Sequence, residues 1–403
     1  MRILHTSDWH LGRTLYGKKE RVDEHSAFLK WLLQTIREQA VDILLVAGDV
    51  FDTASPNNTS QKMYYDFLLN ACHSGCKKVV VVGGNHDSPS FLNAPKAVLS
   101  ALNVRVIGNA TDNIEDEVIV IKDEKDNPLA VICAVPFLRE RDISRFTEGE
   151  SYADRSKRMA ENMKKHYAVV AELAQNERQK SGKNIPVIAT GHLSVAGGKT
   201  VKDDGVRETF IGNIECVGSE LFPQTFDYVA LGHYHIPAVI NENLRYCGSP
   251  IPMGFGEADQ QKCVYLVDFK DNNPVITTIE IPVFQRMEAI RGDKAYIEER
   301  LTNLKNANLP VWVEIIYEGN EVFPDLAAWV NDKIAGAEIE LLNLQNRLFI
   351  NEVLSRDDSA QSLDELNIVE VFNKLLDKSD ISDEQKAELK QYYNEIVSQL
   401  EDP

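Results

Sequence analysis

Five short segments of this chain repeat one pattern, in which an apolar run ends in a tight turn and side chains able to bind metal follow at once. The polar parts of these segments are Ser7-Asp8-Trp9-His10, Gly48-Asp49, Gly84-Asn85-His86-Asp87, Gly191-His192 and Gly232-His233-Tyr234-His235. Short apolar runs predict buried strands, and glycine allows a sharp exit that points the next side chain into a cleft. Since α/β sheets place their sites at the carboxyl ends of strands, we expect the five segments to meet at one site.

The first two thirds of the 403 residues alternate strand-like and helix-like patterns, which predicts an α/β domain with layered sheets. The strand-like runs are residues 2–6, 41–47, 78–82, 104–107, 118–121, 130–135, 186–189, 228–231, 244–247 and 263–269. The helix-like patterns are residues 22–39, 60–71 and 152–180.

The pattern changes after residue 282, where strand, helix, strand, helix and strand follow one another in a short space. A polar, acidic linker and two amphipathic helices then end the sequence. We therefore expect a first domain over residues 1–283, a small α+β module over 284–350 and a helical tail over 351–403. The apolar stripes of the tail helices either pack on their own chain or dock a partner; their residues are Leu366, Val369, Phe372, Leu389, Tyr393 and Ile396.

The residues that end the five segments decide the chemistry. They offer carboxylate, amide and imidazole donors without a thiolate, a set that suits Mn²⁺, Fe²⁺ or Zn²⁺. The candidate ligands are Asp8, His10, Asp49, Asn85, His192, His233 and His235. These are too many for one ion with an open position, but they fit two ions that share a carboxylate, for which Asp49 is the natural bridge. His86 is left to act on a reacting phosphate, and Asp52 and Asp87 are expected to orient histidines from behind.

Composition and the absence of further motifs limit which ligands the chain can bind and where the protein acts. The net charge of −19 argues against a surface made mainly for nucleic acid, but bound metals can supply positive charge to a phosphodiester substrate. The sequence has neither a P-loop nor a dinucleotide fingerprint, so we expect this chain to bind no nucleotide. No apolar run is long enough for a membrane span, and the six cysteines form no Cys-x-x-Cys pair. We expect a cytoplasmic protein.

The five motifs resemble those of the calcineurin-like metallophosphoesterases. Flanking stretches, among them His5-Thr-Ser-Asp-Trp-His-Leu-Gly12 and Arg245-Tyr-Cys-Gly-Ser-Pro-Ile-Pro252, narrow the resemblance to the SbcD family, the nuclease subunits of bacterial SbcC–SbcD complexes. The likeness covers nearly the whole chain. It implies a layered β-sandwich domain flanked by helices, followed by a capping domain that helps to position DNA and by C-terminal helices that grip the coiled coil of an SbcC-type ATPase.

The resemblance also implies a function. One ion would be held by Asp8, His10, Asp49 and His235, and the other by Asp49, Asn85, His192 and His233, with His86 acting on the phosphate. The expected activity is Mn²⁺-dependent double-strand exonuclease and hairpin or single-strand endonuclease action in DNA end processing, recombination and repair. The expected assembly is a homodimer within a heterotetramer, associated with the nucleoid.

Alternatives remain open at this stage. The five motifs alone also permit a calcineurin-like phosphatase or a cyclic-nucleotide phosphodiesterase. A DNA-end scaffold with a vestigial site would lack a ligand, and none is missing. Basic residues after the first motif either contact DNA phosphates or form a solvated turn; they are Arg13, Lys18, Lys19 and Arg21.

Overall fold

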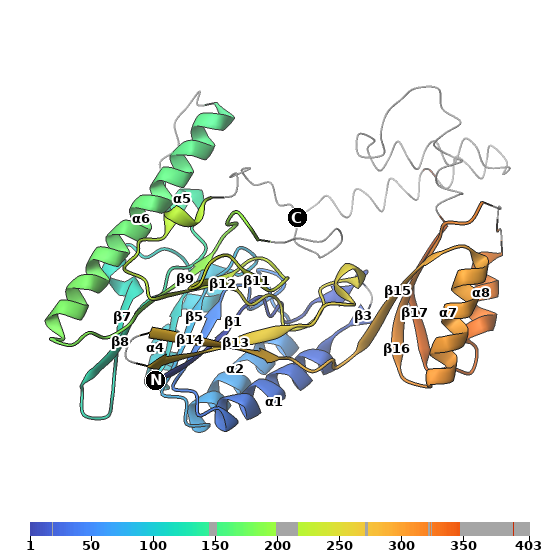
Figure 1. Cartoon of the computed structure of the whole chain (residues 1–403), viewed down its shortest axis with the longest axis horizontal. Helices are drawn as coiled ribbons and strands as arrows, with labels where there is room; N and C mark the ends of the chain where they lie inside the picture. The colour runs from blue at the N-terminus through green and yellow to red at the C-terminus, as the bar shows by residue number, and fades with distance from the viewer. Residues whose placement is uncertain are drawn as a thin grey trace. The chain divides into compact units, whose positions relative to one another are not determined.

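The computed structural model describes residues 1–17, 19–144, 151–198, 217–270, 273–320, 323, 325–346 and 390 (Figure 1). The chain divides into two compact units. The first comprises Met1–Ala289 with Pro310–Trp312, and the described part of the second comprises Ile290–Leu309 and residues within 313–346.

The first unit is built on two six-stranded sheets. The first sheet has the order β14-β13-β1-β4-β5-β6. Its strands β1, β4, β5 and β6 are parallel, and β13 and β14 are added antiparallel at one side. Its strands are β1 (Arg2–Thr6), β4 (Ile43–Ala47), β5 (Lys78–Val82), β6 (Val104–Ile107), β13 (Cys263–Lys270) and β14 (Asn273–Glu280). The edge strand β14 is the one strand of this sheet that the sequence patterns did not predict.

The second sheet has the order β11-β12-β10-β9-β8-β7, with parallel strands at its centre. Its strands are β7 (Val118–Lys122), β8 (Pro128–Cys133), β9 (Val187–His192), β10 (Tyr228–Gly232), β11 (Ala238–Val239) and β12 (Leu244–Tyr246). The long helix α6 (Tyr152–Lys180) covers its outer face and buries Met163, Tyr167 and Val170 against the strands.

The two sheets pack face to face because their strands are apolar on both sides. In β4, Leu44 and Val46 pack outward against helices α1 (Val22–Glu38) and α2 (Asn58–His73). The alternate residues, Ile43 and Leu45, point the other way, into the layer shared with the second sheet. The layers are therefore helix, sheet, sheet, helix, with α1 and α2 on one side and α6 on the other (Figure 1). The predicted α/β sandwich flanked by helices is confirmed.

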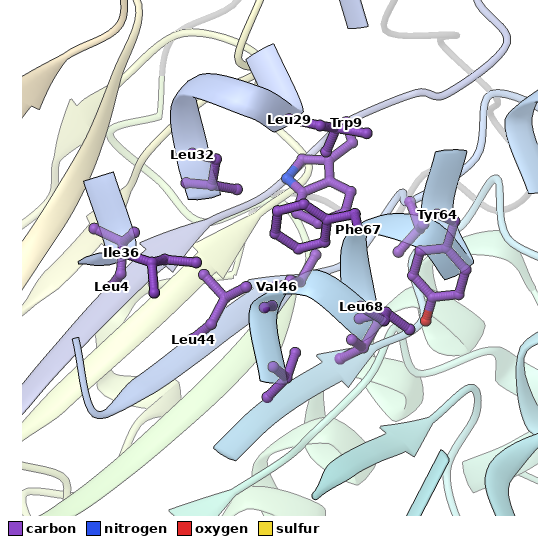
Figure 2. Close-up of a cluster of buried hydrophobic side chains, with 14 of the residues drawn as sticks. Leu4, Trp9, Leu29, Leu32, Ile36, Leu44, Val46, Tyr64, Phe67 and Leu68 are labelled. Atoms are coloured by element: carbon purple, nitrogen blue, oxygen red, sulfur yellow. The ribbon is translucent and has the colours of Figure 1, made fainter. Parts of the chain in front are cut away.

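Trp9 anchors the first motif in the core between the first sheet and its helices (Figure 2). Its ring is fully buried and packs edge-to-face against Phe67 at 5.1 Å between ring centres. Its indole N–H donates to Thr6 Oγ1 at 2.9 Å. The large apolar side chain between Asp8 and His10 therefore fixes the backbone from which both of them project.

Short elements connect the layers of the first unit. They are β2 (Thr14–Leu15), β3 (Lys19–Glu20), α3 (Pro89–Asn93), α4 (Lys96–Ala101), α5 (Glu140–Ile143) and the 3₁₀ turns η1 (Ile114–Glu117), η2 (Ser219–Leu221) and η3 (Phe255–Glu257). In the part of the chain that the structure describes, no helix is long and apolar enough to cross a bilayer.

The small module has a sheet of its own with the order β15-β16-β17. Its elements are β15 (Arg286–Gly292), α7 (Lys294–Ala307), β16 (Val311–Tyr317), α8 (Leu326–Ile334) and β17 (Ile339–Asn346). Asp293 caps the start of α7 by accepting from the backbone N–H of Tyr296, and Asn308 ends the helix in the left-handed conformation.

His5 is buried between the two sheets. Its ring nitrogens lie 2.9 Å from the Tyr228 hydroxyl and 3.1 Å from the carbonyl oxygen of Leu231. Burial lowers the pKa of His5 from 6.5 to about 3, outweighing its backbone hydrogen bond. The folded protein therefore holds this imidazole neutral, whereas the unfolded chain protonates it below its ordinary pKa.

This predicts a pH-dependent loss of stability. The contribution of neutral His5 is complete above pH 6.5 and is lost as the pH falls toward 3, at about 1.4 kcal/mol per pH unit for one proton. The free energy of unfolding of the chelator-treated protein is measured with urea between pH 7 and 4. Its dependence on pH should be less steep in His5→Gln, by the equivalent of about one proton. The exposed His73, changed to Gln, is the control. An unchanged slope in His5→Gln would mean that the folded protein already carries the proton.

Candidate active site

The five motifs lie at the carboxyl ends of five strands that belong to both sheets. β1, β4 and β5 of the first sheet end at the first three motifs, and β9 and β10 of the second sheet end at the last two. The site therefore sits at one end of the sandwich, where both sheets contribute, and is not confined to the edge of one sheet.

The backbone at this site is strained. Asp8, His10, Asp49 and His233 have positive φ angles of 52°, 46°, 48° and 104°. Such conformations cost of order 1–3 kcal/mol each in non-glycine residues and concentrate at functional sites. Gly232 shows how tightly the loops are packed, because a Cβ there would collide with the carbonyl oxygen of Ala47. Any side chain at this position would separate the two sheets at the site.

Asp8, His10 and His235 form the first of two clusters, which we call the first group. The Nε2 atoms of His10 and His235 face each other at 3.1 Å. Asp8 brings a carboxylate oxygen within the same small volume. All three side chains are buried, with exposed fractions of 0% to 2%.

Asn85, His192 and His233 form the second group. The amide oxygen of Asn85 lies 3.0 Å from His192 Nε2 and 3.0 Å from His233 Nδ1. His192 is fully buried, whereas Asn85 and His233 are partly exposed. The second group therefore lies toward the open side of the site.

Asp49 lies between the two groups. Its Oδ2 atom is 3.2 Å from His192 Nε2 and 3.6 Å from His10 Nε2. Its Oδ1 atom accepts from the backbone N–H of His86 at 2.9 Å. One buried carboxylate thus faces both groups and also holds the third motif in place.

The arrangement of nitrogen and oxygen lone pairs at the site suits the binding of cations. Carboxylates stand behind both facing histidines, Asp52 Oδ1 at 3.2 Å from His10 Nδ1 and Glu257 Oε1 at 3.7 Å from His235 Nδ1. These acceptors favour protons on the two Nδ1 atoms, which leaves two Nε2 lone pairs pointed at each other. Facing lone pairs repel unless a positive charge lies between them, and mixed oxygen and imidazole donors suit divalent transition metals.

The pKa shifts agree with this chemistry. Burial lowers the pKa of His10, and burial lowers the pKa of His233 to about 3, so both rings favour the neutral form, which is the form able to bind a metal. Burial opposes a charge on His192, but Asp49 outweighs it and raises the pKa of His192 to about 9. Burial would likewise raise the pKa of Asp49, but His192 holds it well below its usual range. The proton on His192 takes the position that a cation would fill.

His86 borders the site from the third motif. Its ring packs edge-to-face against that of His10, with 4.9 Å between ring centres. Its Nδ1 atom lies 2.9 Å from the carbonyl oxygen of Asp52, and because a carbonyl can only accept, Nδ1 carries the proton. The partly exposed ring therefore keeps Nε2 for another partner.

Asp52 and Asp87 act in different ways. Asp52 contacts His10, as expected of a residue that orients a histidine. The expectation for Asp87 is corrected, because its carboxylate accepts from backbone N–H groups instead of a histidine. Those donors are Val50, Phe51 and Gly84, so Asp87 ties together the loops that carry Asp49 and Asn85.

The basic residues after the first motif are not equivalent. Arg21 is 1% exposed and forms a two-pronged ion pair with Glu24 at 2.7 Å, so the prediction that it contacts DNA is wrong. Arg13 is partly exposed and pairs with Asp52 at 3.2 Å. Lys19 is partly exposed in β3, and Lys18 lies outside the described residues. The six tail residues predicted to dock a partner also lie outside them.

Sequence reasoning did not predict that Arg139, Glu257 and Lys262, outside the five motifs, support the site. Arg139 donates to the carbonyl oxygens of Gly84 at 3.1 Å and Asp87 at 2.9 Å, bracketing the two residues between them. Glu257 and Lys262 form a buried pair behind His235. No motif marks these residues, and only the fold brings them to the site.

Comparison with known proteins agrees with this fold. A family model described as calcineurin-like phosphoesterase matches residues 1–237. Another, described as type 5 capsule protein repressor C-terminal domain, matches residues 283–380. The chain therefore belongs to the calcineurin-like phosphoesterases, and it is a metal-dependent phosphodiester hydrolase.

Curated relatives narrow this class. The chain is 34% identical to the SbcD subunit of the nuclease SbcCD of Escherichia coli (strain K12), over 99% of this chain and 98% of that one. It is 28% identical to the protein of the same name from Bacillus subtilis (strain 168), over 100% of this chain and 99% of that one. Within the phosphoesterases, the chain belongs to the SbcD family.

The buried Arg21–Glu24 pair predicts a structural role for Arg21. Arg21→Ala should lower the free energy of unfolding by about 3–5 kcal/mol, because it leaves Glu24 buried without its partner. Urea unfolding measures this loss. The exposed pair Lys62–Asp66 gives the control, since Lys62→Ala should cost no more than about 1 kcal/mol. Weaker DNA binding by Arg21→Ala at unchanged stability would restore its predicted role.

Proposed function

We propose that this protein is a Mn²⁺-dependent DNA nuclease that binds two divalent ions. One ion is held by the first group together with Asp49, and the other by the second group together with Asp49. The observation that carries the proposal is the position of Asp49, whose Oδ2 atom lies within 3.6 Å of a histidine nitrogen from each group. Two bound ions would supply an activated water molecule and positive charge for the attacking and leaving oxygens of a displacement at phosphorus.

The chain's own residues bind and orient the substrate. The partly exposed side of the site carries Asn85, His86 and His233, so a phosphodiester approaches from there. His86 is the catalytic residue. Its ring is fixed through Nδ1 by the Asp52 carbonyl, and its Nε2 atom stabilises charge on the phosphate or carries a proton to the leaving oxygen.

DNA is the proposed substrate because the relatives that match the chain over nearly its whole length are named as nuclease subunits. The proposed action is exonuclease cleavage of double-stranded ends and endonuclease cleavage of hairpins, in recombination and repair of nucleoid DNA. Arg13 and Lys19, both partly exposed, are the described residues that remain candidates for phosphate contact.

The proposed partner is an SbcC-type ATPase, since the relatives' name makes them one component of a complex called SbcCD. Residues 284–350 are proposed to help position DNA, and the helices of residues 351–403 to dock the partner's coiled coil. The assembly proposed is a homodimer within a heterotetramer. No nucleotide site is proposed for this chain, so any ATP would be bound by the partner.

The activity is tested on a labelled double-stranded DNA hairpin with Mn²⁺, beside a small phosphodiester and a phosphomonoester. We expect hairpin cleavage that a chelator abolishes and that His86→Ala reduces by about 10²–10⁴-fold. Activity on the monoester alone would indicate a phosphatase and contradict the nuclease proposal. Turnover of the small diester alone, in the presence of the partner, would contradict it as well.

Metal content separates the roles of two residues. His86→Ala should keep its metal, because its ring is assigned to the phosphate. Asp49→Ala should lose metal as well as activity, because both ions share that carboxylate. Metal analysis after dialysis measures the difference. Normal metal content in Asp49→Ala would contradict the bridging assignment.

The docking role of the tail gives a separate prediction. Deleting residues 362–403 should abolish co-purification with an SbcC-type partner, while hydrolysis of a small phosphodiester is retained. The retained hydrolysis is the internal control for folding of the first unit. Unchanged co-purification would contradict the docking role.

A further inference from the structure

A buried pair of opposite charges lies behind His235. Glu257 is 0% exposed and Lys262 is 4% exposed. The Oε2 atom of Glu257 accepts from Lys262 Nζ and, at 3.1 Å, from the backbone N–H of Met253. Its Oε1 atom lies 3.7 Å from His235 Nδ1 and has no hydrogen-bond partner among the residues that the structure describes. A buried carboxylate oxygen without a donor is costly, and His235 Nδ1–H is the nearby group able to satisfy it.

The same network holds the backbone of His235. Lys262 Nζ donates to the His235 carbonyl oxygen at 2.9 Å and to Ser249 Oγ at 3.1 Å. The backbone N–H of Ser249 donates to that same carbonyl at 3.0 Å. Both ends of His235, its ring and its main chain, are therefore positioned by the segment that follows β12.

The arrangement repeats what Asp52 does for His10. In each case a carboxylate stands at Nδ1, and the Nε2 atom faces the other histidine at 3.1 Å. His192 of the second group differs, because its Nδ1 atom faces the neutral carbonyl oxygen of Ala47 at 2.9 Å. Among the described contacts, carboxylates outside the candidate ligand set stand only behind imidazoles of the first group, because the carboxylate near His192 Nδ1, that of Asp8 at 4.0 Å, belongs to that set.

Lys262 is the counter-charge of Glu257, because its Nζ atom contacts Glu257 Oε2 and both side chains are buried. A carboxylate behind a metal-binding histidine fixes its tautomer and makes the ring a stronger donor, and losing such a partner typically costs 10–100-fold in metal affinity.

We infer that Glu257, with Lys262 as its counter-charge, is a positioning residue that strengthens metal binding by the first group through His235. This inference rests on the metal assignment of the proposed function. Its consequence is that the two ions bind with different affinity, and that Glu257 acts on one of them.

The test is titration of metal-free full-length protein with Mn²⁺, with free Mn²⁺ followed by electron paramagnetic resonance. The variant Glu257→Gln/Lys262→Met removes both charges together and so avoids leaving one unpaired. We expect one of the two binding steps to weaken by 10–100-fold and the other to stay unchanged. Hairpin cleavage should fall at low Mn²⁺ and recover at saturating Mn²⁺. If the double variant does not fold, Glu257→Gln alone is measured in the same way.

Two further variants make the result specific. Glu117→Gln changes another fully buried carboxylate that contacts a histidine, His166 at 2.7 Å, and should leave both steps unchanged. His235→Ala should weaken the same step as the double variant. If His235→Ala leaves both steps unchanged, the metal assignment itself has failed. If His235→Ala weakens one step while the Glu257 variant changes neither step, the positioning role of Glu257 is overturned. That role is also overturned if the Glu257 variant weakens both steps equally.

Discussion

The buried carboxylate of Asp49 is the interaction on which the rest of the site depends. An isolated buried charge is strongly unfavourable, so the protein must surround it with partners. Those partners come from three other motifs. His10 Nε2 lies 3.6 Å from Oδ2, His86 donates its backbone N–H to Oδ1, and His192 Nε2 lies 3.2 Å from Oδ2. Stabilising one charge thus assembles the loops that carry the candidate metal ligands and His86.

The fold makes this assembly possible by dividing the work between two sheets. Strands with apolar residues on both faces form a rigid double layer, and only their ends are left to carry polar chemistry. The cost appears as left-handed backbone at four site residues. Trp9, which lies between Asp8 and His10 in the sequence, offsets part of that cost by packing into the core (Figure 2).

Much of this could be predicted from sequence, for a physical reason. Buried parallel strands are continuous apolar runs, and β1, β5 and β6 have the bounds that their patterns indicate. The strand β14 was missed because it is an exposed edge strand with a proline near its start and polar residues alternating along it. The motifs indicated the candidate metal ligands, since those residue types recur at strand ends.

The features that could not be predicted from the sequence depend on tertiary contacts. Arg21 belongs to a basic cluster, and only its burial beside Glu24 shows that its charge is used inside the protein. The three-residue spacing of that pair on one helix turn was the available signal. Glu257 ends the 3₁₀ turn η3, outside the five motifs, and nothing in its local sequence relates it to His235. Sheet membership was equally hidden, because strand order is set by long-range pairing.

The spread of the site along the chain has a consequence for biosynthesis. Asp8 accepts from the backbone N–H of His233, a residue 225 positions later, at 2.9 Å. Contacts this distant close only after large loops have lost their entropy, so they form late in folding. A ribosome must therefore release β10 and the residues after it before Asp8 and His10 can meet His233 and His235. Until then the nascent chain lacks His233 and His235, and the set of candidate ligands is incomplete throughout more than half of its synthesis.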